Sequence, residues 1–223
     1  MGARDHPGLR VVRVFCAEDG SGGNPLGVFL DGTAIAESER QPIAHELSFS
    51  ETVFVDDPER GVMRIFTPES ELPLAGHPLV GTAWLLRDAG FEVDILRPPP
   101  GEVPVRFDRE VVYAAARPEW CPPFEWFELG SPDEIDVLDG GPEGVGLAGM
   151  WAWIDEATGL VRARVFCPEE GIPEDEATGS AAILLTTRLA RPLEIRQGRG
   201  SVIHARPLPD RRGEIGGRVT LEV

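Results

Sequence analysis

A carboxylate inside an apolar segment is the first feature of this sequence that could do chemistry. Glu51 stands within residues 49–55, Phe-Ser-Glu-Thr-Val-Phe-Val. Burial beside phenylalanine and valine would disfavour the charged form of Glu51 and raise its pKa. A carboxyl group with a raised pKa is suited to act as a general acid and base. The alternative is a surface glutamate at the start of a strand.

Two glycine-containing segments, residues 75–78 and 175–180, each lead into an apolar stretch that we expect to be a helix. The start of a helix exposes unpaired backbone N–H groups at the positive end of its dipole. Two such starts facing one cleft would bind an anion, most simply a substrate carboxylate. Gly76 and Gly179 would let a ligand approach the backbone closely, and Ser180 would add a hydroxyl group. The alternative is that these residues only cap helices.

Other polar residues lie beside these segments or apart from them. His77 could orient a substrate or relay a proton, or it could simply cap or pack against the helix. Asp175 could cap the second helix or serve as a second carboxylate. We expect His45 and His204 to be structural. We also expect three acids to lie on solvated faces: Glu156, Glu169 and Glu170.

Several familiar active-site patterns are missing. Residues 20–25, Gly-Ser-Gly-Gly-Asn-Pro, have the glycines of a phosphate loop but lack its Lys-Ser/Thr pair and following helix, so they predict a turn or bulge before a strand. The patterns GxSxG, HExxH and GxGxxG do not occur, so nothing supports a hydrolase triad, a zincin or a Rossmann cofactor site. Cys16, Cys121 and Cys167 have neither the number nor the spacing of a disulfide scaffold or a zinc site. We therefore expect no metal.

The composition narrows the class of protein. The chain has 223 residues, enough for one large domain or two small ones. Its 38 Asp and Glu against 21 Lys and Arg give a net charge of −17, which argues against nucleic acid or an anionic membrane as the main partner. No apolar run is long enough to span a membrane, and residues 1–10 lack the apolar segment of a secretory signal. We expect a soluble cytoplasmic protein.

Many strands and few helices must position these residues. Helices are predicted at 35–47, broken into two pieces by Pro42, at 78–88 and at 180–190. The last two are apolar nearly all round, which indicates burial. Residues 128–146, acidic and rich in glycine, predict an exposed loop. Strands are predicted at 9–15, 26–30, 51–55, 63–66, 103–107, 111–115, 150–154, 161–166, 193–196, 202–205 and 218–223.

The sequence contains an internal repeat with an offset of 100 residues. Residues 64–69, Arg-Ile-Phe-Thr-Pro-Glu, match residues 164–169, Arg-Val-Phe-Cys-Pro-Glu. Both copies continue as an acidic stretch, a glycine-containing turn and a buried helix. The repeat predicts two related domains, which we place at residues 1–112 and 113–223, with the active-site cleft between them.

Four blocks of the chain, residues 23–29, 50–55, 64–78 and 174–182, resemble the PhzF-like proteins of phenazine biosynthesis. Residues 197–201 fit the same pattern, and the blocks span most of the chain in the same order. The resemblance implies the diaminopimelate-epimerase-like fold. This is an α+β fold of two pseudo-symmetric domains, each a curled, mostly antiparallel β-sheet or barrel around a central helix.

The resemblance also implies an activity and a set of site residues. The phenazine enzyme isomerises trans-2,3-dihydro-3-hydroxyanthranilate without a cofactor, by moving a hydrogen across a conjugated ring acid. The same activity here would need a small carboxylic-acid substrate and no cofactor, and the family resemblance suggests a homodimer. The catalytic glutamate corresponds to Glu51. The substrate-binding positions correspond to Gly76, His77, Asp175, Gly179 and Ser180, with Asn24 and Gln197 near the same cleft.

Epimerases of this fold use two facing cysteines, one ahead of each glycine-containing helix start. Ala75 and Ala177 hold those places here, so a two-thiol racemase is not expected. The chain departs from a typical member in being trimmed between residues 120 and 150, and in carrying Glu176 where a proline usually follows the aspartate. These departures leave the phenazine substrate itself open.

Two alternatives to the phenazine-type isomerase remain at this point. One is an epimerase-like enzyme of another secondary-metabolite pathway. The other is a non-catalytic protein of the same fold that binds a small acid. A buried, protonatable Glu51 would favour catalysis, whereas an exposed Glu51 in a filled cleft would favour binding.

Overall fold

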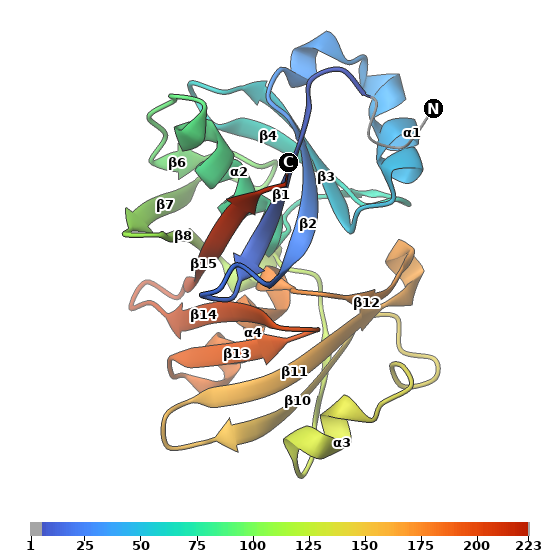
Figure 1. Ribbon diagram of the computed structural model, residues 1–223, viewed down its shortest axis with the longest axis vertical. Helices are drawn as coiled ribbons and strands as arrows, with labels where there is room; N and C mark the ends of the chain where they lie inside the picture. The colour runs from blue at the N-terminus through green and yellow to red at the C-terminus, as the bar shows by residue number, and fades with distance from the viewer. Residues whose placement is uncertain (1–5, 223) are drawn as a thin grey trace.

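The computed structural model describes residues 6–222, and its strands join into one strongly curled sheet (Figure 1). Residues 1–5 and Val223 lie outside the described residues. Part of the N-terminal segment in which no secretory signal was found, and the end of the strand predicted at 218–223, fall on them. The helices are α1 (Glu37–Leu47), α2 (Gly76–Asp88), α3 (Pro132–Asp136) and α4 (Gly179–Leu189), with 3-10 turns at Gly32–Ala34, Pro118–Trp120 and Pro168–Glu170. The strands are β1 (Leu9–Cys16), β2 (Gly22–Phe29), β3 (Glu51–Asp57), β4 (Val62–Phe66), β5 (Glu71–Leu72), β6 (Ile95–Leu96), β7 (Val103–Asp108), β8 (Val111–Ala116), β9 (Glu125–Glu128), β10 (Ala148–Asp155), β11 (Leu160–Cys167), β12 (Ile172–Asp175), β13 (Leu193–Gln197), β14 (Ser201–Pro207) and β15 (Gly213–Leu221).

The same succession of elements occurs twice. The first half runs β3, β4, β5, α2, β6, β7, β8, and the second runs β10, β11, β12, α4, β13, β14, β15. In each half the second strand pairs antiparallel with its two sequence neighbours. After the helix of the second half, β13 pairs parallel with β11. In the first half, Arg97, which follows β6, forms an equivalent parallel bridge with Val62 of β4. The internal repeat of the sequence is therefore a repeat of structure.

Strand β15 joins the two halves. It pairs antiparallel with β14 of its own half and with β1 and β8 of the other half. Figure 1 shows β15 in red beside β1 in blue, so the first and last strands of the chain lie side by side at the centre of the molecule. A sheet continuous through both halves places the ends of β2 and β12 near each other.

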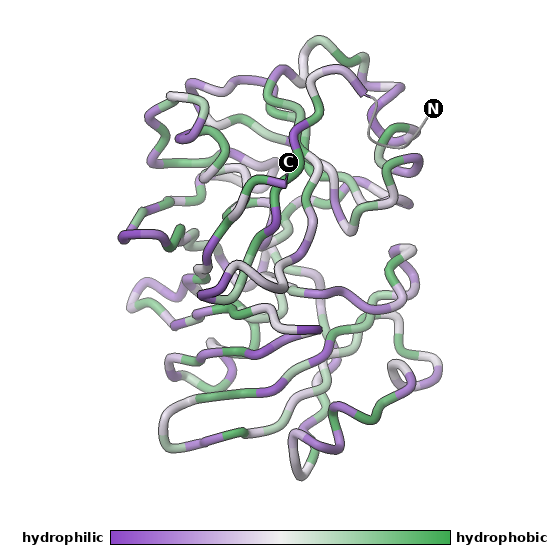
Figure 2. The backbone as a smooth tube through the Cα atoms, in the orientation of Figure 1, coloured by the Kyte–Doolittle hydropathy of each residue, from purple (hydrophilic) through white to green (hydrophobic). Residues whose placement is uncertain are grey.

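Helices α2 and α4 occupy the hydrophobic core, as their apolar composition predicts. Leu79, Leu85 and Leu86 of α2 and Ile183 of α4 have no exposed surface and belong to one cluster. In β11 and β13 buried side chains alternate with more exposed ones, and Figure 2 shows green and purple segments alternating along strands of the lower half. These observations confirm the predicted α+β fold of curled sheets around central helices.

Two predictions about local structure were wrong. Helix α1 is continuous through Pro42 rather than broken there. Because Pro42 has no N–H, the carbonyl of Ser38 has no hydrogen-bond donor within the helix. Ser38 and Pro42 are both exposed, so water can donate to this carbonyl. Residues 128–146 are not simply an exposed loop, because they contain α3, which Ser131 caps by accepting from the Glu134 N–H.

The short helix α3 is held by apolar contact. Its Ile135 is fully buried in a cluster with Ala148, Met150 and Phe166. One apolar side chain in an acidic, glycine-rich stretch is only weak sequence evidence for a helix, which is why α3 was not predicted. None of the described helices has the length and hydrophobicity needed to cross a bilayer.

Candidate active site

Strand β3 carries Glu51 into the interior. The strand lies between β2 and β4, where Glu51 faces Leu26 in the parallel pairing with β2. Glu51 is 7% exposed, and its Oε2 has no hydrogen-bond partner among the described residues. Burial raises the pKa of Glu51 well above 4.5, and the negative charges of Asp175 and Glu170 raise it further. The structure thus excludes the alternative of a surface glutamate.

His77, in the first turn of α2, is 1% exposed and places Nδ1 3.3 Å from Glu51 Oε2. Burial lowers the pKa of His77 to about 3, against a smaller opposite effect of the Pro25 backbone. The imidazole is therefore neutral at neutral pH. Its contact with Glu51 joins a carboxyl group to a neutral ring nitrogen that can either donate or accept a hydrogen bond, depending on the tautomer.

Asn24 and Asp175 join the two halves at this site. Asn24 Nδ2 donates to Asp175 Oδ1 over 2.7 Å and to the Ala177 carbonyl over 3.1 Å, and it lies 3.4 Å from His77 Nδ1. Thr178 Oγ1 donates to Asp175 Oδ2 over 2.6 Å. Burial raises the pKa of Asp175, and the hydrogen bonds from Thr178 and Asn24 oppose that rise. All of these side chains are at least nine-tenths buried.

Gln197, at the end of β13, completes the surroundings of Asp175. Its Nε2 donates to the Asp175 carbonyl and to Thr178 Oγ1, both over 2.9 Å. Its Oε1 accepts from the Thr178 N–H over 3.2 Å. Gln197 therefore holds the segment between β12 and α4 in place.

The starts of α2 and α4 meet directly. A Cβ added to Gly76 would lie 2.4 Å from the Cα of Gly179, and one added to Gly179 would lie 2.8 Å from the Cα of Gly76. The close approach that these glycines permit is, in the structure, that of one helix to the other. The residues before them, Ala75 and Thr178, make no side-chain cap. The alternative that these residues serve only as side-chain caps is therefore not supported at Ala75 or Thr178.

A small cavity lies between the halves, beside Glu51. Its volume is about 30 Å³, the space of roughly one water molecule. A ring acid needs a pocket on the order of several hundred Å³, so the cavity in this structure is too small to hold one. The lining residues come from both halves: Glu51, Thr67, Leu72, Ala75, Pro122, Phe124, Leu147, Cys167, Glu170, Ile172, Asp175, Thr178 and Ser180.

Glu170 does not lie where its sequence context predicted. It was expected on a solvated face, but it lines the cavity, and its Oε2 accepts from Ser70 Oγ over 2.8 Å and from Thr67 Oγ1 over 3.2 Å. The internal repeat could have indicated this position, because Glu170 is equivalent to Ser70 at the offset of 100 residues. Cys167, the equivalent of Thr67, also lines the cavity, and burial raises the pKa of its thiol, which stays protonated.

The other expectations fall outside this cluster. His45 is exposed on α1 and His204 is half-buried in β14. Among residues 6–222, no three His, Cys, Asp or Glu side chains lie close enough to hold a metal ion. The cluster thus offers a buried carboxyl group, a neutral imidazole and two helix starts without side-chain caps around a small cavity.

Comparison with known proteins places this site in a family. The family described as phenazine biosynthesis-like protein matches residues 12–141. The trans-2,3-dihydro-3-hydroxyanthranilate isomerase of Pseudomonas aeruginosa is 34% identical over 230 residues, which cover 84% of this chain and 81% of that protein. The isomerase of the same name from Pseudomonas fluorescens is also 34% identical, over 79% of this chain and 80% of its own.

Solved structures show the same fold at lower identity. A PhzF-family phenazine biosynthesis protein from Enterococcus faecalis superposes with a TM-score of 0.71 at 24% identity, over 96% of each chain. A hydroxyproline epimerase from Agrobacterium vitis superposes with a TM-score of 0.60 at 11% identity, over 96% of this chain and 90% of its own. The predicted epimerase-like fold is therefore confirmed. On the strength of the match over residues 12–141 and of the Pseudomonas relatives, the chain belongs to the PhzF family of phenazine biosynthesis-like proteins.

Proposed function

We propose that this protein is a cofactor-independent isomerase that moves a proton between two carbons of a small cyclic or conjugated carboxylic acid. The substrate class is that of the dihydro-hydroxyanthranilate named for its relatives. The observation that carries the proposal is Glu51: a buried carboxyl group with a raised pKa, at the wall of a cavity between the halves and 3.3 Å from the neutral His77 ring. This is the environment that enzymes use to make a carboxyl group exchange protons near neutral pH.

The proton transfer begins and ends at Glu51. Its carboxylate takes a proton from one carbon of the substrate, and the electron pair of that C–H bond spreads through the adjacent conjugated system. The same carboxyl group then protonates another carbon of that system. No electrons are gained or lost overall, so the product is an isomer of the substrate. His77, 3.3 Å from Oε2, can hydrogen-bond either protonation state of Glu51 without itself becoming charged.

The polar groups around the cavity are proposed to hold the substrate. The helix starts at Gly76 and Gly179 and the hydroxyl of Ser180 would bind its carboxylate. Asp175 would bind another polar group, while Asn24 keeps Asp175 in place through the 2.7 Å hydrogen bond. We further propose that residues 1–112 and 113–223 act as the two domains that open and close this cleft, and that the protein works as a cytoplasmic homodimer, as its family resemblance suggests.

The two alternatives have weaker support. For an epimerase-like enzyme of another secondary-metabolite pathway, the two-thiol mechanism would need cysteines where Ala75 and Ala177 stand, and the raised pKa of Cys167 beside the cavity disfavours its thiolate. A protein that only binds a small acid has no need of a buried carboxyl group with a raised pKa, because burying such a group reduces stability. The burial of Glu51 favours catalysis over binding alone.

Incubation of trans-2,3-dihydro-3-hydroxyanthranilate with the protein in deuterated water tests the reaction class. We expect an isomer that carries deuterium at the carbon which receives the proton, detected by NMR and mass spectrometry. Recovery of unchanged substrate, or formation of an oxidised product, would contradict the proposal.

A further inference from the structure

Beside the pair formed by Asn24 and Asp175, a second chain of hydrogen bonds joins the halves. The Gly23 N–H donates to Ser201 Oγ over 2.9 Å, and Ser201 Oγ in turn donates to Glu176 Oε1 over 2.9 Å. Gly23 precedes Asn24 on β2, and Glu176 follows Asp175 at the end of β12. Two adjacent residues on each segment are therefore linked, which fixes the rotation of one segment against the other as well as their separation.

The backbone around Glu176 leaves room for its carboxylate. The Arg199 N–H donates to Glu176 Oε1 over 2.8 Å. Gly198 has a φ of +57°, and a Cβ there would lie 2.4 Å from Glu176 Cδ. On the opposite side, a Cβ on Gly22 would lie 2.7 Å from the carbonyl carbon of Gly200. The lack of a side chain at Gly198 makes room for Glu176, and the lack of one at Gly22 lets the first half pack closely against Gly200.

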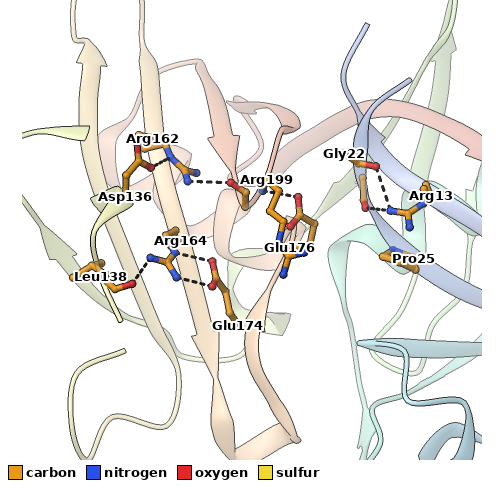
Figure 3. Close-up of a pocket in the computed structure, with 12 residues that line it drawn as sticks. Arg13, Gly22, Pro25, Asp136, Leu138, Arg162, Arg164, Glu174, Glu176 and Arg199 are labelled. Atoms are coloured by element: carbon orange, nitrogen blue, oxygen red, sulfur yellow. Dashed lines mark hydrogen bonds and ion pairs between the residues drawn. The ribbon is translucent and has the colours of Figure 1, made fainter. Parts of the chain in front are cut away.

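Glu176, Arg199 and Gly22 line a groove of about 760 Å³. Figure 3 shows Glu176 and Arg199 between Arg162 and Arg164 on one side and Gly22 on the other. The groove's arginines Arg162 and Arg164 are engaged elsewhere, with carboxylates and backbone carbonyls of their own half. Glu176 is different, because its Oε1 accepts from the hydroxyl of Ser201, which in turn accepts from the Gly23 N–H of the first half.

The burial of Ser201 makes this series of hydrogen bonds dependent on Glu176. It has no exposed surface, so its hydroxyl cannot turn to bulk water for an acceptor. Removing the Glu176 carboxylate would leave a buried O–H donor unsatisfied or force it to rotate away from the Gly23 N–H. Either outcome weakens the link to the first half.

We propose that Glu176 is a positioning residue: through Ser201 and Gly23 it holds β2 against the end of β12 and so sets the geometry of the Asn24 and Asp175 pair. A proline, which usually follows this aspartate in the family, has no side-chain acceptor for such a chain. The link itself is independent of the reaction, whereas its effect on turnover rests on the proposed function.

Amide hydrogen exchange of Gly23, followed by NMR, tests the link without a substrate. Glu176→Ala should speed exchange of this N–H by about tenfold, the effect of losing one buried hydrogen bond. Glu176→Gln should restore slow exchange, because its amide oxygen still accepts from Ser201. Glu174→Ala is the matched control, since Glu174 lies two residues earlier, on β12, and pairs with Arg164 instead. The N–H of Leu85 in the core reports global opening in every variant.

Unchanged exchange of Gly23 in Glu176→Ala would overturn the proposal, as would equal acceleration at Leu85 or in Glu174→Ala, or failure of Glu176→Gln to restore protection. With trans-2,3-dihydro-3-hydroxyanthranilate, kcat/KM should fall by about tenfold in Glu176→Ala and recover in Glu176→Gln. If the wild-type protein shows no turnover, the proposed function fails, and the exchange of Gly23 still decides the role of Glu176.

Discussion

Replacement of Glu51 by glutamine should stabilise the protein at neutral and alkaline pH. The carboxyl group is buried with Oε2 unpartnered and with the negative charges of Asp175 and Glu170 nearby. Its ionisation inside the fold is therefore unfavourable, which is why the folded-state pKa lies above 4.5. Glutamine keeps the shape of the side chain and removes the charge, so the variant no longer carries this penalty.

The sign of the pH dependence follows from the direction of the shift. Because the folded protein binds the Glu51 proton more tightly than the unfolded chain does, the contribution of Glu51 to stability is full below 4.5 and is lost as the pH rises through the raised folded-state pKa. The Glu51→Gln variant lacks this titration. Its advantage in the free energy of unfolding should therefore be small near about pH 5 and grow to roughly 1–3 kcal/mol near about pH 8, the penalty of a poorly satisfied buried polar group.

Urea unfolding of both proteins at the two pH values measures this difference. The midpoint should move while the slope m stays constant, which would show that the folded state and not the unfolded chain has changed. Glu92→Gln is the control, because Glu92 is exposed and should give no such pH-dependent difference. A Glu51→Gln variant that is less stable than the wild type at alkaline pH, or whose advantage does not change with pH, would refute the reasoning.

Two further substitutions probe the helices that support the site. Gly76→Ala would place a Cβ 2.4 Å from Gly179 Cα and should lower the free energy of unfolding by roughly 1–3 kcal/mol, whereas Gly140→Ala, where a Cβ would meet nothing within 4 Å, should change it little. Equal unfolding midpoints for these two variants would contradict the contact between helix starts. Leu79→Ala removes a fully buried side chain of α2 and should lower the unfolding free energy by about 2–5 kcal/mol in urea titrations; a loss below about 1 kcal/mol would contradict its place in the core.

The sequence revealed the fold through features that act locally or repeat. Helices α2 and α4 could be predicted because their apolar residues cover every face, and a helix of that kind must be buried. The repeat at an offset of 100 residues predicted two equivalent sets of strands. The burial of Glu51 was only one of two interpretations, since a strand start can face either the core or water.

The site could be predicted only in part because its contacts join residues far apart in the chain. The 2.7 Å hydrogen bond between Asn24 and Asp175 spans 151 positions, and no local pattern marks it. Glu170 was misread because acids in a turn are usually solvated, although its repeat partner Ser70 turns out to bind it across the cavity. Pro42 was misread because a rule for helix interiors does not tell whether the lost hydrogen bond faces water.

The rate of isomerisation by Glu51→Gln tests the central claim most directly. With trans-2,3-dihydro-3-hydroxyanthranilate, kcat of the variant should fall by about 10²- to 10⁴-fold, the usual effect of losing a general acid and base, while binding of the substrate persists. A kcat within a few-fold of the wild-type value, in a variant that is folded and binds substrate, would contradict the assignment of the proton transfer to Glu51.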